Sequence, residues 1–260
     1  MAGILKAEMK RVWRARAACF FLLVYGAVGF LYYGASGPWV CTVGPGGETE
    51  GFIPNPNWGG TSNQIELGGS IGVASMAHSL FAPLIAIAFC AWFFGTNANA
   101  RQALVSLARG EKREVVIAAR ALAAGIWMSS AFAIYSILLF ALFGMGCWGQ
   151  VAALALPFLN RLVIEVLLVF SFTGICAAIF SQTGGNEYVV GLLVFASYTT
   201  FVLKFYVADM VLPSHIVYLM LASSPMWPSG LATQAVAYSI ISALAVMCIC
   251  FVVCRIRQRR

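Results

Sequence analysis

The chain alternates long apolar stretches with short polar ones. Each stretch reaches or approaches the roughly 20 apolar residues that a helix needs to cross a bilayer. The pattern therefore predicts an all-α integral membrane protein, with six transmembrane helices in one domain over residues 1–260. The predicted spans are 17–36, 70–94, 121–145, 162–181, 188–206 and 232–254.

A different pattern precedes the first span. Over residues 3–16, apolar side chains recur at helical spacing and basic side chains occupy the other side. This amphipathic pattern predicts a helix that lies along the cytoplasmic membrane surface. The alternative is a basic flank that only fixes the orientation of the first span. The apolar positions are Leu5, Met9, Val12 and Trp13, and the basic ones are Lys6, Lys10, Arg11 and Arg14.

The segments between spans differ in character. Residues 37–69 are rich in Gly, Pro and Asn and contain no Lys or Arg, which indicates an outer loop. Residues 146–160 form an apolar outer connector, and 182–187 form a tight cytoplasmic turn. Residues 207–231 are too broken by proline to cross the bilayer, yet too apolar for a free loop. They are expected to form a re-entrant outer hairpin, because non-helical backbone at membrane depth must be buried in protein.

Composition and charge placement support this topology. The chain is 61% hydrophobic and 10% charged, against roughly 45–50% and 25% in soluble domains. Of its 16 Lys and Arg residues, only Arg161 and Lys204 lie outside the N-terminus, the 101–120 loop and the C-terminal tail. Basic residues beside spans mark the cytoplasmic side, so both termini are expected inside. The net charge of +7 is thus an orientation signal and does not indicate a nucleic-acid partner.

Few polar residues are available for chemistry within the spans. Neither a phosphate-binding GxxxxGK[ST] motif nor HExxH occurs, and His78 and His215 have no carboxylate at useful spacing. No catalytic or metal site is expected. Arg161 and Glu165 are spaced i, i+4 and can pair along one helix face. They are interpreted either as a functional intramembrane pair or as an interfacial pair that reaches the outer border.

The eight cysteines show no CxxC spacing. Most lie in apolar stretches, where a free thiol behaves as a small hydrophobe. Cys41 and Cys147 both fall on the outer side and could form a disulfide in an oxidising compartment. Two unpaired thiols are the alternative interpretation.

The loop between spans two and three is the longest polar cytoplasmic segment. Within it, Leu104, Leu107 and Ala108 share a helical face, and Gly110 is placed to end the turn. A short helix over 98–109 is expected, followed by a charged connector.

This loop resembles the first cytoplasmic loop of ABC-2 type transporter permeases. The resemblance rests on Gly95-Thr96, the segment 102–108, the Arg-Gly-Glu-Lys-Arg turn at 109–113, and Arg120 at the start of the next span. The order of parts is also similar: a surface helix, six spans, and an apolar outer hairpin before the last span. The outer loop 37–69 is long for the family, and no substrate motif can be matched.

The resemblance implies a bacterial inner-membrane exporter that pairs with a second, identical or homologous permease. A separate ATP-binding subunit would bind ATP and Mg and would contact residues 98–109 as a coupling helix, with residues 3–16 as a connecting helix. Small permeases of this kind serve drug, bacteriocin or lantibiotic efflux. The docking residues that it implies are Arg101, Leu104, Val105, Leu107, Arg109 and Arg113.

Other functions stay open from the residues themselves. The loop charges could serve orientation alone. An ion-coupled secondary transporter would need buried acids, and Glu165 is the only acid inside a predicted span. A membrane enzyme would need a convergent polar cluster, which the sequence does not provide. A non-transport membrane assembly protein is compatible with the composition.

Overall fold

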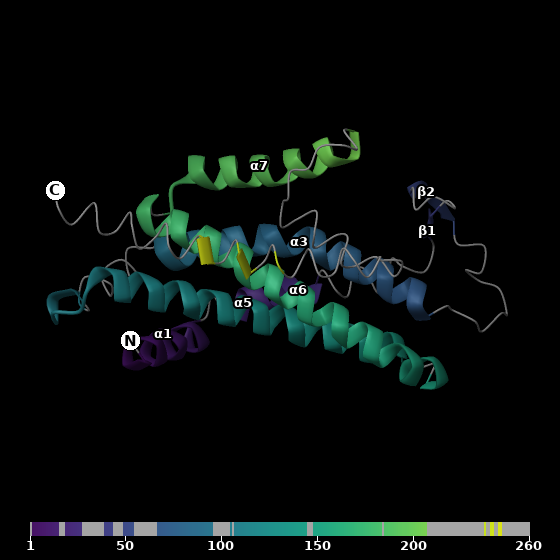
Figure 1. Cartoon of the computed structure of the whole chain (residues 1–260), viewed down its shortest axis with the longest axis horizontal. Helices are drawn as coiled ribbons and strands as arrows, with labels where there is room; N and C mark the ends of the chain where they lie inside the picture. Colours follow the sequence, from purple (N-terminus) through teal and green to yellow (C-terminus); the bar gives the residue numbers. More distant parts are fainter. Residues whose placement is uncertain are drawn as a thin grey trace.

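The computed structural model describes residues 2–15, 19–27, 39–43, 49–54, 67–95, 105, 107–144, 148–183 and 185–206, and positions 237, 240, 241, 244 and 245. Apart from one small hairpin, these residues are mainly helical, which confirms the helical fold class. The elements with stated bounds are α1 (Ala2–Arg14), β1 (Trp39–Val43), β2 (Thr49–Pro54), α3 (Leu67–Gly95), α5 (Arg113–Gly144), α6 (Trp148–Thr183) and α7 (Glu187–Tyr206) (Figure 1).

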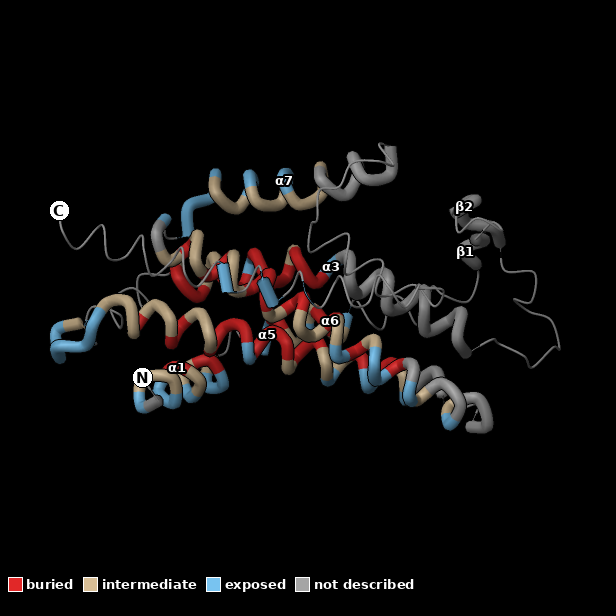
Figure 2. Tube along the Cα trace, viewed as in Figure 1, coloured by how far each residue is buried: buried red, intermediate tan, exposed pale blue. Residues whose placement is uncertain are grey.

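The helices α3, α5 and α6 pack together as the centre of the molecule. Trp127 of α5 stacks on Phe89 of α3 with ring centroids 4.7 Å apart and planes 9° apart. The Ser129 hydroxyl donates to the carbonyl oxygen of Val166 on α6 at 3.3 Å, one of the contacts that fix the antiparallel register of α5 and α6. The buried residues concentrate where these helices meet (Figure 2).

Within the described parts of the chain, two helices are long and apolar enough to cross a bilayer. The qualifying segments are Arg113–Ala141 in α5 and Phe158–Ser181 in α6. With 32 and 36 residues, the full helices extend for roughly 48 and 54 Å, well beyond the roughly 30 Å hydrocarbon core. The helix α5 begins before the predicted span 121–145, and α6 extends beyond both ends of the predicted span 162–181.

The outer connector predicted over 146–160 is helical from residue 148, where α6 begins. Its Ala- and Leu-rich sequence has high intrinsic helix propensity. The helix therefore begins before the predicted span 162–181. Pro83 similarly lies inside α3 without ending it.

The outer loop predicted over 37–69 contains a hairpin that the sequence analysis missed. The strands β1 and β2 pair antiparallel from Trp39–Pro54 to Val43–Thr49, with an irregularity between Thr42 and Val43. The strand WVCTV is rich in β-branched residues, which suit a pleated surface. The hairpin lies at the opposite end of the bundle from the segment that leads into α5 (Figure 1).

Exposed apolar side chains form stripes on the faces of α5 and α6 that do not pack against other helices. The largest are Ile134, Ile137 and Leu138 on α5, and Leu156, Leu159 and Val163 on α6. Soluble monomers rarely expose apolar patches of large extent. These stripes indicate surfaces that contact lipid or another chain.

The tight turn expected over 182–187 is confirmed between α6 and α7. The Oδ1 atom of Asn186 accepts a hydrogen bond from the Tyr188 backbone N–H at 2.9 Å, and the Asn186 carbonyl accepts from Val189 and Val190 at 3.1 Å. Asn186 thus caps the start of α7. Next to it, Gly185 lies against the last residue of α3, Gly95.

Several expectations fall outside the described residues. They are the outer part of the first span, the re-entrant segment 207–231 and most of the span 232–254. The same holds for the side chains of Cys41, Cys147 and Lys204.

The contact between Gly95 and Gly185 yields the first prediction. A Cβ on Gly185 would lie 2.8 Å from the Gly95 Cα and 2.9 Å from the Ala91 carbonyl oxygen. Because both neighbours are backbone atoms, Gly185→Ala should lower the free energy of unfolding by about 1–3 kcal/mol, the usual cost of overpacking. Thermal unfolding of the purified protein measures this loss.

Gly191→Ala is the matched control, because a Cβ there meets nothing within 4 Å. It should leave the melting temperature unchanged or slightly raised, since Ala favours helix over Gly. Equal melting temperatures for both variants would contradict the close contact.

Candidate functional site at the end of helix α3

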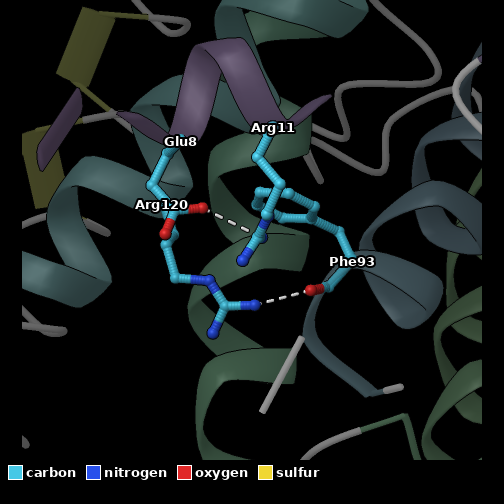
Figure 3. A network of polar contacts seen from close by, with 4 residues as sticks. All are labelled: Glu8, Arg11, Phe93 and Arg120. Atoms are coloured by element: carbon cyan, nitrogen blue, oxygen red, sulfur yellow. Dashed lines mark hydrogen bonds and ion pairs between the residues drawn. The ribbon is translucent and has the colours of Figure 1, made fainter. Parts of the chain in front are cut away.

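Four residues from three helices meet at the C-terminal end of α3. Glu8 and Arg11 come from α1, Phe93 from α3 and Arg120 from α5 (Figure 3). We call this group the α3-end cluster. It lies directly before the segment that contains the predicted coupling helix.

The C-terminal end of α3 requires hydrogen-bond donors and positive charge. The last four carbonyl groups of a helix have no partner within it, and they form the negative end of the helix dipole. The last turn of α3 contains no basic residue of its own. Arg120 of α5 compensates: its Nη2 donates to the Phe93 carbonyl oxygen at 2.6 Å, and its side chain is only 5% exposed.

Arg11 joins α1 to the same place. Its Nη2 lies 2.9 Å from Glu8 Oε2, and its Cζ lies 4.4 Å from the centroid of the Phe93 ring. Arg120 also faces this ring, at 5.1 Å, and the Phe94 ring at 4.7 Å. A desolvated cation–π contact of this kind is worth roughly 1–2 kcal/mol. The aromatic pair of α3 therefore holds cations from two other helices.

The charges of the α3-end cluster nearly balance. Burial lowers the pKa of the Arg11 guanidinium from its ordinary value, and the nearby Glu8 carboxylate partly offsets this effect. Glu8 compensates Arg11, and the C-terminal dipole of α3, equivalent to about half a negative charge, partly compensates Arg120. Buried charges are tolerated only when paired in this way.

The predicted apolar positions of the N-terminal helix differ in burial, and one predicted polar position is corrected. Val12 is buried, whereas Trp13 is 55% exposed. Arg11, assigned to the polar side, lies inward over Phe93. Leu5 and Met9 are half-buried. Glu8 was not singled out because a helical-face pattern places every charge outside, although a paired Glu and Arg can be buried together.

The predicted coupling segment is described at residue 105 and from 107 onward. Val105 is helical and 50% exposed. The Arg109 N–H donates to the Val105 carbonyl at 3.2 Å, and the Gly110 N–H donates to the Leu107 carbonyl at 3.0 Å. Gly110 has φ of 85°, a left-handed conformation that favours glycine. The prediction that this glycine ends the turn is confirmed.

The other predicted docking residues differ in their surroundings. Arg109 is exposed, Leu107 is half-buried, and Arg113 is half-buried at the first residue of α5. Arg101 and Leu104 lie outside the described residues. The exposed turn therefore lies, in sequence, between the end of α3 at Gly95 and the start of α5 at Arg113.

Arg161 and Glu165 form a separate polar pair on α6. Arg161 Nε lies 3.7 Å from Glu165 Oε1, and the Glu165 side chain is almost fully buried. In the part of the chain that the structure describes, Cys19, Cys90 and Cys176 are free thiols. The same part contains no group of three or more His, Cys, Asp or Glu residues placed to hold a metal ion.

The chain matches no protein-family model, no curated protein sequence and no solved structure. Its function must therefore be inferred from the residues and their arrangement.

Removal of the Arg120 guanidinium tests the α3-end cluster. Arg120→Met keeps the aliphatic volume but leaves the buried Phe93 carbonyl without its donor. The free energy of unfolding should fall by about 1–3 kcal/mol, the cost of an unsatisfied buried group. Chemical denaturation in detergent measures this change.

Arg109→Met is the control, because Arg109 is an exposed arginine outside the cluster. It should unfold as the unmodified chain does, and Arg120→Lys should recover part of the stability by retaining the charge. A loss for Arg109→Met equal to that for Arg120→Met would show that the Phe93 contact has no special role.

Proposed function

We propose that this chain is the transmembrane permease subunit of an ATP-driven ABC-2 type exporter in the bacterial inner membrane. Six helices cross the bilayer, both termini lie inside, and two permeases form a dimer. A separate subunit binds ATP and Mg and docks on the segment 98–109. The main support for this proposal is the exposed turn around Val105 and Arg109, which connects the end of α3 to the start of α5.

Force applied to that turn would reach several helices at once. The segment leaves α3 two residues after Phe93 and enters α5 at Arg113, two turns before Arg120. Arg120 and Arg11 hold the end of α3 against α5 and α1. Because packed groups of this kind shift as units, a partner that closes on the turn would move α1, α3 and α5 together.

The membrane location has its own support. The segments Arg113–Ala141 and Phe158–Ser181 are long and apolar enough to cross a bilayer, and both helices carry exposed apolar stripes. The hairpin and the exposed turn lie at opposite ends of the bundle (Figure 1). This arrangement suits an outer hairpin and an inner docking turn.

The substrate class follows from the family resemblance and from the apolar interior. A hydrophobic or amphipathic molecule, such as a drug, a peptide or a lipid-like compound, would leave the cytoplasm or the membrane. The permease supplies the path, and ATP binding and hydrolysis occur on the other subunit. This proposal assigns phosphate binding and catalysis to that subunit alone.

An ion-coupled secondary transporter is the second candidate, and one observation favours it. Glu165 is buried inside the apolar segment Phe158–Ser181, as an ion-carrying acid would be. The two functions differ in their energy source. Purified permease that transports without an ATP-binding subunit would favour the second candidate.

The orientation of the two ends can be measured by thiol labelling. In a background without native cysteines, Val105→Cys should react with a membrane-impermeant maleimide only after the cells are opened. Thr49→Cys, in the hairpin, should react in intact spheroplasts. Labelling of Val105→Cys from outside would remove the docking role of the turn.

Docking of the ATP-binding subunit is the central test. Val105→Asp places a charge on an exposed apolar position that the partner would desolvate. It should reduce the co-purified ATP-binding subunit and ATP-dependent transport by at least about tenfold, the effect expected at an interface hot spot. Quantitative mass spectrometry of the purified complex and transport in vesicles provide the two readouts.

Val105→Ile is the matched control, because it keeps the side chain apolar, and it should preserve both readouts. Both variants should fold, because Val105 is exposed. Thermal unfolding checks this. Full ATP-dependent transport by Val105→Asp would refute docking at this turn.

A further inference from the structure

Glu165 lies far from the α3-end cluster and has no role in docking. It belongs to the buried stripe of α6 that also contains Leu162 and Val169, and it is 1% exposed. Its position falls within the apolar segment Phe158–Ser181. An ionisable residue in such a place is costly and usually serves a function.

The contact with Arg161 is a poor structural ion pair. Arg161 Nε approaches Glu165 Oε1 at 3.7 Å, which is too long for a hydrogen bond. Among the described residues, no donor makes a hydrogen bond to Glu165 Oε1. A buried ion pair contributes to stability only with excellent geometry and additional hydrogen bonds. By this criterion, the separation of 3.7 Å is a weak geometry for a purely structural ion pair.

The surroundings of the Arg161 guanidinium resemble a binding site for an organic cation. The Glu165 carboxylate lies near it, and the Phe158 ring centroid lies 5.9 Å from the guanidinium carbon. Phe158 in turn stacks on Phe140 of α5, with centroids 4.2 Å apart and planes 19° apart. A carboxylate beside aromatic rings recognises cations by charge and by cation–π attraction.

Access to Glu165 requires little rearrangement. Arg161 is itself mostly covered, with a side chain 13% exposed. The exposed part of this side chain reaches the surface of the protein, and a change in its rotamers would uncover the carboxylate.

We propose that Glu165 is the anionic contact of a binding site for organic cations with an apolar body. Arg161 fills the cation position while the site is empty, and Phe158 and Phe140 contact the apolar part of the ligand. This inference rests on the proposed exporter function and narrows its substrate class to cationic amphiphiles.

Binding of a fluorescent cation tests the site directly. The full chain in nanodiscs of zwitterionic lipid is titrated with rhodamine 6G, a lipophilic cation, and with the zwitterionic rhodamine B, and polarisation is measured. Glu165→Gln should raise the dissociation constant for rhodamine 6G by at least about tenfold, the change expected when one charge-assisted contact is lost. Rhodamine B should bind more weakly and should not depend on Glu165.

Substitution of Arg161 distinguishes a binding site from a purely structural ion pair. The two hypotheses predict opposite changes in the affinity for rhodamine 6G. Arg161→Met removes the competing internal cation and should tighten rhodamine 6G binding severalfold. Arg161→Lys retains a competing cation and should bind nearly as the unmodified chain does. Glu187→Gln, at an exposed acid on α7, should have no effect.

Thermal unfolding identifies variants that fail to fold, and in that case Glu165→Asp and Arg161→Gln replace them. Glu165→Asp keeps the charge and should retain most of the binding, and Arg161→Gln should tighten it. Unchanged binding by Glu165→Gln overturns the proposal. Parallel losses of binding and stability in the Glu165 and Arg161 variants also overturn it.

This assay needs neither ATP nor a partner subunit, so its outcome is independent of docking. Val105→Asp should bind rhodamine 6G normally. Loss of docking in Val105→Asp together with unchanged cation binding in Glu165→Gln would leave the exporter function standing and reject the site. Glu165-dependent cation binding with transport that needs no ATP-binding subunit would reject the exporter function and keep the site.

Discussion

A helix that ends inside a packed bundle needs donors for its last carbonyl groups and positive charge for the end of its dipole. The helix α3 meets this need with side chains from other helices. Arg120 of α5 donates to the Phe93 carbonyl, and Arg11 of α1 lies over the Phe93 ring. The positions of α1 and α5 relative to α3 are therefore set by directional polar contacts as well as by apolar packing, which has no preferred direction.

The same helix end fixes the connection between α6 and α7. Gly185 approaches the backbone of Ala91 and Gly95 more closely than any residue with a Cβ could. The last turn of α3 thus contacts α1, α5 and the α6–α7 turn, and the exposed segment toward Val105 begins directly after it. Under the proposed function, a partner at the exposed turn would therefore act on all of these elements.

The sequence predicted the parts of this arrangement that depend on local pattern. Apolar stretches located the helices, and Gly110 and the turn before Asn186 were placed correctly because glycine and capping residues act within a few positions. The i, i+4 spacing of Arg161 and Glu165 likewise predicted their pairing.

Non-local contacts could not be found in the same way. Arg11 and Phe93 are far apart in the chain. The helical periodicity of apolar and polar residues assigns Arg11 to the exposed face, because that periodicity carries no information about the ion pair with Glu8. The pairing of β1 with β2 was missed because the Gly- and Pro-rich sequence around these strands is typical of loops.

The α3-end cluster and the Arg161–Glu165 pair are buried charged groups that differ in geometry. In the α3-end cluster, Arg120 makes a hydrogen bond of 2.6 Å, and Arg11 makes an ion pair of 2.9 Å. These short contacts supply the donor and the positive charge that the C-terminal end of α3 requires. Glu165 lies in the middle of α6, and its carboxylate is buried at 3.7 Å from the Arg161 guanidinium. Apolar residues of similar size would fill that place at lower cost. The long separation between this carboxylate and its arginine suits the proposal that a cationic ligand takes the place of the arginine.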